Sequence, residues 1–123
     1  MGLDMYLEKR KKNSKEDKYE EVAYWRKANQ IREWFNKHIS IANCEYSPVE
    51  KSILIQLKND CIKVLNDHSR AAELLPTSSG FFFGSTEYDE WYFEDLKETV
   101  VVLTQILEET DWETEEIVYY EWW

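Results

Sequence analysis

Two cysteines and two histidines are the side chains best suited to bind a metal in this chain of 123 residues. His38 and Cys44 have five residues between them, and Cys61 and His68 have six. Structural zinc sites usually take cysteines in closely spaced pairs, and the sequence contains no Cys-x-x-Cys pair. Cys61 and His68 also continue the apolar stripe of a predicted helix. We therefore expect free structural thiols and imidazoles, with no metal, no disulfide and no cofactor.

A second candidate chemistry is ligand binding by cations beside aromatic rings. Residues 24–29 read Tyr-Trp-Arg-Lys-Ala-Asn, and such rings can stack on a nucleobase while the cations meet phosphates. The glycine-flanked loop 80–84 holds three phenylalanines, but it has no lysine and therefore differs from a phosphate loop. Two interpretations stay open: core residues with solvated cations and a buried crossover, or a pocket for a flat ligand. The pocket would be lined by Trp25, Arg26, Lys27 and Phe82.

The C-terminal part of the chain is strongly acidic. From Glu87 onward it carries 13 acids and one base, Lys97, within a chain of net charge −10. Many tryptophans and tyrosines accompany these acids, and such rings supply contact area in protein interfaces while charge steers a partner of opposite sign. The alternative is a solvated helix face that maintains solubility. We assign the predicted surface for a basic partner to Glu108, Glu109, Asp111, Trp112 and Glu113.

Several function classes have little support in the sequence. No motif places a nucleophile beside a base, and no carboxylate is marked for a raised pKa, so we expect no catalytic residues and no enzyme. The basic run at 9–12 is followed at once by acids, which favours a solvated loop that offsets the acidic half over direct nucleic-acid binding. The sequence has no long apolar run and no signal-peptide pattern, which predicts no membrane association and a cytoplasmic location.

Apolar periodicity predicts the helices that must position these residues. The spacing indicates helices over 17–38, 48–67 and 89–110. Ser47, Pro48 and Glu50 match a capping box at the start of the second helix. Residues 69–75 favour a further short helix before Pro76.

The two ends of the chain have a different pattern. Leu3, Met5 and Leu7 alternate with polar residues at period two, and residues 116–123 are rich in β-branched and aromatic side chains. Because an isolated strand is unstable, the simplest partner for each end is the other end. The sequence thus predicts a mainly α (α+β) single domain over 1–123, with a three-helix core and a small sheet formed by the N- and C-terminal strands.

Three separated motifs carry a resemblance to a known group of proteins. They are Gly-Leu-Asp-Met-Tyr-Leu at 2–7, Tyr-Trp-Arg-Lys-Ala-Asn at 24–29, and Gly-Phe-Phe-Phe-Gly-Ser at 80–85. Together with Leu-Leu-Pro at 74–76 and Tyr-Asp at 88–89, they resemble a family of small proteins of phages and prophages. The resemblance implies a viral or mobile-element setting and assigns no activity, cofactor or catalytic residue.

The sequence-based hypothesis is a non-catalytic protein that binds a basic host protein, such as a nucleic-acid-binding enzyme, in the host cytoplasm. Many small acidic phage proteins look like inhibitors of host nucleases, and this analogy of size, charge and source favours a counter-defence inhibitor of the anti-CRISPR or anti-restriction kind that mimics nucleic acid. One alternative is a protein that binds or sequesters a nucleotide signal. Another is a small enzyme whose site is not visible in the sequence.

Overall fold

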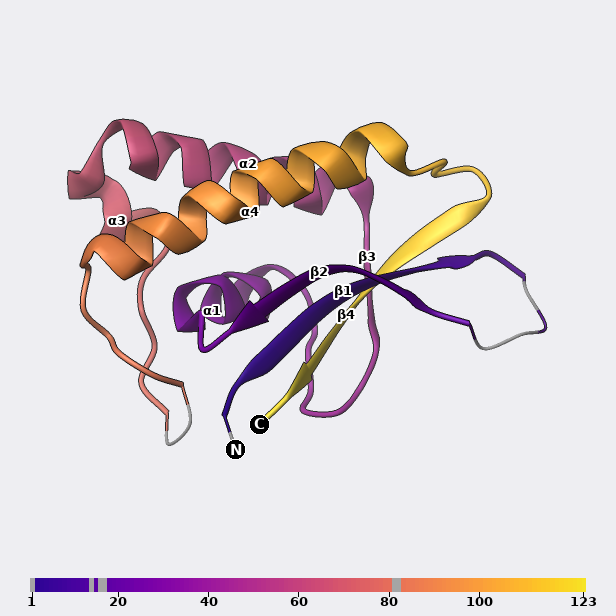
Figure 1. Cartoon of the computed structure of the whole chain (residues 1–123), viewed down its shortest axis with the longest axis horizontal. Coiled ribbons are helices and arrows are strands. Elements are labelled where there is room, and N and C mark those ends of the chain that lie inside the picture. The colour runs from indigo at the N-terminus through magenta and orange to yellow at the C-terminus, as the bar shows by residue number, and fades with distance from the viewer. Residues whose placement is uncertain (1, 14, 16–17, 81–82) are drawn as a thin grey trace.

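The computed structural model describes residues 2–13, 15, 18–80 and 83–123. The N-terminal strand β1 (Asp4–Lys11) lies antiparallel to the C-terminal strand β4 (Glu115–Trp122), and the two termini lie near each other in Figure 1. This confirms the predicted pairing of the chain ends. Strands β2 (Glu20–Arg26) and β3 (Ser47–Val49) extend the sheet to four strands in the order β2-β1-β4-β3, and each neighbouring pair is antiparallel.

The helices pack on one face of this sheet. They are α1 (Asn29–His38), α2 (Lys51–Asn66), α3 (Ala71–Leu74) and α4 (Glu90–Glu109), and a 3₁₀ turn (His68–Arg70) precedes α3. Figure 1 shows α2 and α4 side by side above the strands, with α1 beside the sheet. The fold is therefore α+β, and the short helix predicted within 69–75 is confirmed.

Alternation along the strands places the core on the helix-facing side of the sheet. Leu3, Met5 and Leu7 are fully buried, as their period-two spacing predicts. Tyr119 of β4 is also buried and contacts Phe35 of α1 with ring centroids 4.5 Å apart. Helix α2 joins α1 through a hydrogen bond of 2.9 Å from the Trp34 indole to Asp60.

The predicted helix over 17–38 is wrong in its first half, because residues 20–26 form strand β2. Ala23 and Trp25 are buried while Tyr24 and Arg26 are exposed, which is the alternation of a strand. Lys27 then adopts a left-handed backbone with φ of 56°, its amide donates to the Leu3 carbonyl, and α1 begins only at Asn29.

The predicted capping box is also wrong. Ser47, Pro48 and Val49 form β3 and pair with β4, so α2 begins at Lys51 with Glu50 as its N-cap residue. Pro48 disfavours helical backbone in the residue before it, and it lacks an N–H, which an edge strand tolerates. The third helix agrees closely with the prediction, since α4 spans 90–109 and the Asp89 side chain caps it by accepting from the Tyr92 amide.

Trp25 links β2 to α4 through a buried hydrogen bond. Its indole N–H donates to the Thr99 hydroxyl at 2.9 Å, and Thr99 is fully buried. A Thr99→Val substitution keeps the shape but leaves the indole N–H without an acceptor. We expect a loss of about 1–3 kcal/mol in the free energy of unfolding, measured by urea denaturation.

Thr104→Val is the matched control for this substitution. Thr104 also lies on α4 and, like Thr99, donates its hydroxyl to the backbone carbonyl four residues earlier. Unlike Thr99, it accepts no hydrogen bond from a tryptophan. Equal destabilisation by the two variants would contradict a stabilising role for the Trp25–Thr99 bond.

Candidate functional site

The Asn29 side chain holds the loop before α4 against the start of α1. Its amide nitrogen donates to the carbonyls of Phe83 and Ser85, at 2.9 and 2.8 Å, and its amide oxygen accepts from the Ser78 amide at 2.9 Å. Asn29 is only 1% exposed, so these bonds replace the hydrogen bonds to water that the amide loses on burial. One side chain therefore holds both described loop segments, 78–80 and 83–85.

Two glycines allow further close approach at this point. A Cβ atom on Gly84 would lie 3.0 Å from the Cβ of Lys27, and Gly84 has a φ of 82° that favours glycine. A Cβ on Gly2 would lie 3.1 Å from Lys27 Cε and 3.2 Å from Arg26 Nη2. The three motifs at 2–7, 24–29 and 80–85, which are far apart in the sequence, thus meet in one place.

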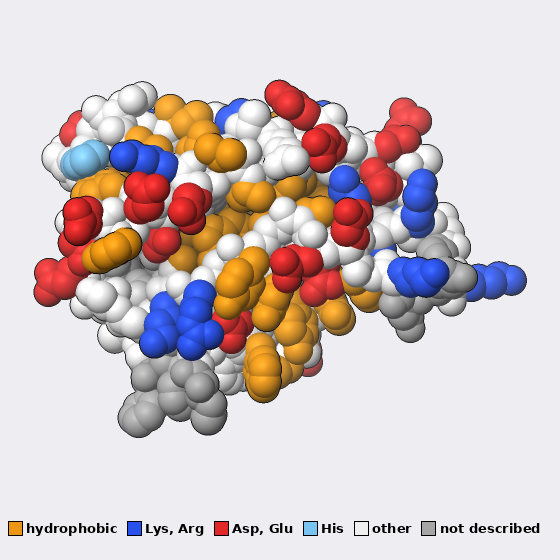
Figure 2. Space-filling model, viewed as in Figure 1, with side chains coloured by type: hydrophobic (Ala, Val, Ile, Leu, Met, Phe, Trp, Pro, Cys, Tyr) orange, Lys and Arg blue, Asp and Glu red, His pale blue; other side chains and the backbone are white. Residues whose placement is uncertain are grey.

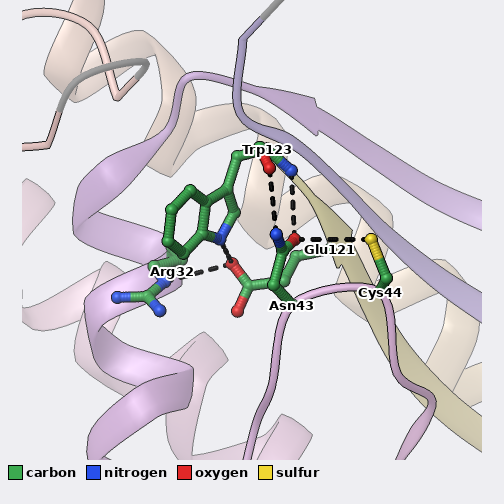
Figure 3. A network of polar contacts seen from close by, with 5 residues as sticks. All are labelled: Arg32, Asn43, Cys44, Glu121 and Trp123. Atoms are coloured by element: carbon green, nitrogen blue, oxygen red, sulfur yellow. Dashed lines mark hydrogen bonds and ion pairs between the residues drawn. The ribbon is translucent and has the colours of Figure 1, made fainter.

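A polar network holds the C-terminus beside the same loop (Figure 3). Arg32 of α1 donates to the fully buried Glu121 carboxylate at 3.1 Å, and the Trp123 indole donates to the same oxygen at 2.9 Å. Asn43 exchanges two hydrogen bonds with the backbone of Trp123. The Arg32 guanidinium lies 5.2 Å from the Phe83 ring centroid, so this network also supports Phe83.

The region bounded by this loop and the start of α4 is a cleft of about 330 Å³. This volume lies within the range that holds a small organic ligand. In Figure 2 basic side chains at the end of β2 lie below acidic side chains at the start of α4. The cleft is lined by Arg26, Lys27, Gln30, Thr77, Gly84, Ser85, Glu87, Asp89, Trp91, Tyr92 and Asp95.

The two walls of the cleft carry opposite charge. Arg26 lies 3.3 Å from the Asp4 carboxylate and keeps about half of its side chain exposed, and Lys27 has no acidic partner within the described part of the chain. The opposite wall carries Glu87, Asp89 and Asp95. A ligand with an anionic end and a hydrogen-bond-donating end would therefore match both walls.

Burial changes the protonation of Asp95, a carboxyl group of the cleft. Burial raises its pKa to about 6, and the nearby carboxylates Glu98, Asp89 and Glu94 act in the same direction. The Gln30 amide opposes this shift, because it donates to the Asp95 carboxylate at 3.2 Å. Asp95 can therefore accept a hydrogen bond at neutral pH and becomes a donor as it protonates below about pH 6.

Two of the remaining cleft side chains carry aliphatic hydroxyl groups. The Thr77 hydroxyl donates to the Thr86 carbonyl at 3.0 Å, and the Ser85 hydroxyl accepts from the Glu87 amide at 3.0 Å. Both hydroxyls thus bond to backbone groups instead of to a general base. The Trp91 indole is 71% exposed at the rim and offers a free ring for stacking.

The residues predicted for the alternative ligand site separate into distinct groups. Arg26 and Lys27 line the cleft. Trp25 does not, because the alternation of β2 turns its ring into the core, where it is 6% exposed. Phe82 lies outside the described residues. Its neighbour Phe83 is buried, in keeping with the predicted core role of the phenylalanine loop, and forms no strand.

The predicted partner surface lies at the far end of α4. Glu108, Glu109, Asp111 and Glu113 are exposed there, but Trp112 is half-buried against the core. Bases from β1 lie close by. Lys12 donates to the Trp112 carbonyl at 2.7 Å, Lys9 lies 4.0 Å from Glu115, and Arg10 forms an ion pair with Glu116. The predicted offset of acids by the basic run is therefore present at this end of the molecule.

Sequence reasoning missed the acidic and aromatic parts of the cleft. Gln30, Trp91 and Asp95 were not candidates, although Trp91 and Asp95 lie within the acidic segment after Glu87. The only available signal was that Trp91 is apolar yet lies off the stripe of Phe93, Leu96 and Val100. The link between Gln30 and Asp95 joins residues 65 positions apart and depends on the packing of α1 against α4.

The thiols and imidazoles do not meet. Cys61 is buried, as predicted, and burial raises its thiol pKa, whereas Cys44 is exposed, and both are free. His38 stacks on Trp34 and His68 on Phe93. Among the residues that the structure describes, no group of three or more His, Cys, Asp or Glu side chains could hold a metal ion.

No known family, curated protein or solved structure matches the chain in sequence or fold comparisons. Within the described ranges, no helix is both long and apolar enough to cross a membrane.

The raised pKa of Asp95 predicts a measurable pH dependence of stability. Because the folded-state pKa of about 6 lies above the ordinary value of 3.8, the folded state binds more protons in this interval. The contribution of Asp95 to stability is thus fully present below pH 3.8 and is lost as pH rises through about 6. We expect Asp95→Asn to flatten the fall of the urea midpoint across this interval.

Glu98→Gln removes a neighbouring exposed carboxylate and serves as the control. It should leave most of the pH dependence in place. If Asp95→Asn and the unchanged protein show the same pH profile, Asp95 does not titrate as its burial indicates.

Proposed function

We propose that this protein binds a nucleotide in the cleft between the Lys27 turn and the start of α4, without catalysis. The observation that carries the proposal is the combination of opposed charged walls with an exposed indole in one cleft of suitable size. In the phage setting that the resemblance implies, such a protein would sequester a nucleotide signal of the host.

The phosphate and the base of a nucleotide each have a complementary group in the cleft. Arg26 and Lys27 supply positive charge for the phosphate, and arginine donates in the planar geometry that phosphate oxygens accept. Trp91 supplies a ring for stacking on the base. Asp95, whose carboxylate the Gln30 amide holds in place, supplies an acceptor for the edge of the base.

The acidic wall also narrows the choice of ligand. Glu87 and Asp89 repel a free phosphate, so the affinity must come from a molecule that keeps its phosphate at the basic wall. A base with an exocyclic amino group has two N–H donors for the acidic wall, whereas the pairing edge of uracil has only its N3–H. Adenine, cytosine or guanine nucleotides are therefore favoured over uridine nucleotides.

Isothermal titration calorimetry with AMP, UMP, adenosine and inorganic phosphate tests this proposal. We expect AMP to bind more tightly than each of the other three ligands. The double variant Arg26→Ala/Lys27→Ala should weaken AMP binding about tenfold or more, because hydrogen bonds to charged groups contribute about 1.5–3 kcal/mol each. Its effect on adenosine should be small, because adenosine lacks the phosphate.

Lys37→Ala/Lys63→Ala is the matched control, since it removes the same charge from exposed residues outside the cleft. It should leave AMP affinity within about twofold. Equal losses in the two double variants, or no heat of binding for AMP, would refute the proposal. Chromatography should recover AMP unchanged, and its conversion to another compound would show catalysis.

A further inference from the structure

The face of the sheet opposite the helices carries a row of tyrosines. Tyr24 of β2, Tyr6 of β1 and Tyr120 of β4 lie side by side, with ring centroids 5.1 and 6.1 Å apart. Tyr46 continues the row 4.9 Å from Tyr120, and Tyr19 stacks on Tyr46 at 4.5 Å. Four of these rings cross the sheet from β2 to the segment before β3, and Tyr19, which precedes β2, adds a fifth. The five rings are here named the tyrosine row.

Much of this face is open to water. Tyr24 and Tyr46 are each 47% exposed, and Trp122, which follows Tyr120 on the same face, is 60% exposed. Figure 2 shows hydrophobic side chains gathered over the strands, with acidic side chains beside them. An exposed aromatic patch of this kind is typical of a protein interface, where tyrosine and tryptophan are enriched.

The charges on the face leave two carboxylates without a cation. Arg26 pairs with Asp4, and Arg10 pairs with Glu116 while its guanidinium lies 5.4 Å from the Tyr19 ring centroid, so both cations already have partners on this face. Glu8 lies two residues after Tyr6 on β1, on the same face of the sheet, and pairs with Glu21 of β2. Neither Glu8 nor Glu21 has an ion-pair partner within residues 2–13, 15, 18–80 and 83–123.

The uncompensated charge affects the pKa values of Glu8 and of a nearby tyrosine. Burial raises the pKa of Glu8, and the carboxylate of Glu21 raises it further. Burial also raises the pKa of Tyr46, and the charge of Glu8 adds to that shift. A cation placed over the tyrosine row beside Glu8 would meet both an unpaired carboxylate and the negative faces of the rings.

We propose that the tyrosine row docks an arginine-bearing segment of a partner protein, with a guanidinium over the rings and paired to Glu8. Guanidinium is favoured over ammonium because its plane stacks on an aromatic ring while its edge donates to a carboxylate. This surface combines the acidic and aromatic character that the sequence predicted at 108–113, where Trp112 is half-buried. The inference does not depend on the nucleotide cleft.

The same charges disfavour other occupants of this face. Nucleic-acid phosphates would approach two unpaired carboxylates. A second copy of the chain in a symmetric dimer would bring the same carboxylates of both copies toward one face without a cation between them. A partner cation satisfies the carboxylates and the rings together.

Fluorescence anisotropy with a labelled peptide of repeated Arg-Gly units tests the proposal on the full chain. We expect Glu8→Gln/Glu21→Gln to weaken binding about threefold to thirtyfold, as two ion pairs of about 0.3–1 kcal/mol imply. Tyr24→Ser/Tyr46→Ser should also weaken binding although it leaves the net charge unchanged. Both substituted tyrosines are half exposed, and circular dichroism checks that each variant keeps its fold.

Glu108→Gln/Glu113→Gln is the matched control, because it removes the same charge at exposed positions on the far end of α4. It should change the affinity less than about twofold. An equal loss in this control would mean general attraction to an acidic protein and would overturn the proposal. Equal affinity for a Lys-Gly peptide, or unchanged binding in both sheet-face variants, would also overturn it. The proposal would likewise be wrong if the protein dimerises in sedimentation, or binds a single-stranded oligonucleotide, and Tyr24→Ser/Tyr46→Ser abolishes that association.

Discussion

The candidate site depends on the buried amide of Asn29. This one side chain bonds to the backbone of residues 78, 83 and 85, and thereby fixes the described loop segments 78–80 and 83–85 against the first turn of α1. Each such bond contributes about 1 kcal/mol net, but an unpaired buried amide or carbonyl loses more than that. Loss of the amide would therefore release both segments, and with them the Ser85 side of the cleft.

The sheet separates two surfaces of different chemistry. Its helix-facing side is filled by Leu3, Met5, Leu7 and Tyr119, while its other side exposes the tyrosine row. The cleft lies at the end of β2, where Lys27 leaves the sheet in a left-handed conformation. Because the Arg26 side chain lies between the cleft and Asp4 of the open face, occupation of either surface can alter the electrostatic field at the other.

Elements with a local sequence pattern could be predicted from the sequence. Elements that form only by pairing with a distant segment could not. Helix α4 follows from an apolar stripe and an aspartate cap, and the terminal strands follow from alternation. Residues 20–26 also alternate, but Tyr24 fits a helical spacing with Ala28, Ile31 and Phe35, and only pairing with β1 selects the strand. The cleft brings together Arg26, Gln30 and Asp95 from separate elements. The sequence therefore predicted only the basic wall, where Arg26 and Lys27 are adjacent.

The most direct test of the account is to map nucleotide binding residue by residue. Two-dimensional ¹H–¹⁵N NMR of the labelled protein during titration with AMP measures which amides and indoles change environment. The account predicts that shifts concentrate at Lys27, Gln30, Ser85, the Trp91 indole and Asp95, while the amides of 108–113 stay unchanged. Shifts centred on 108–113, or no shifts at millimolar AMP, would contradict it.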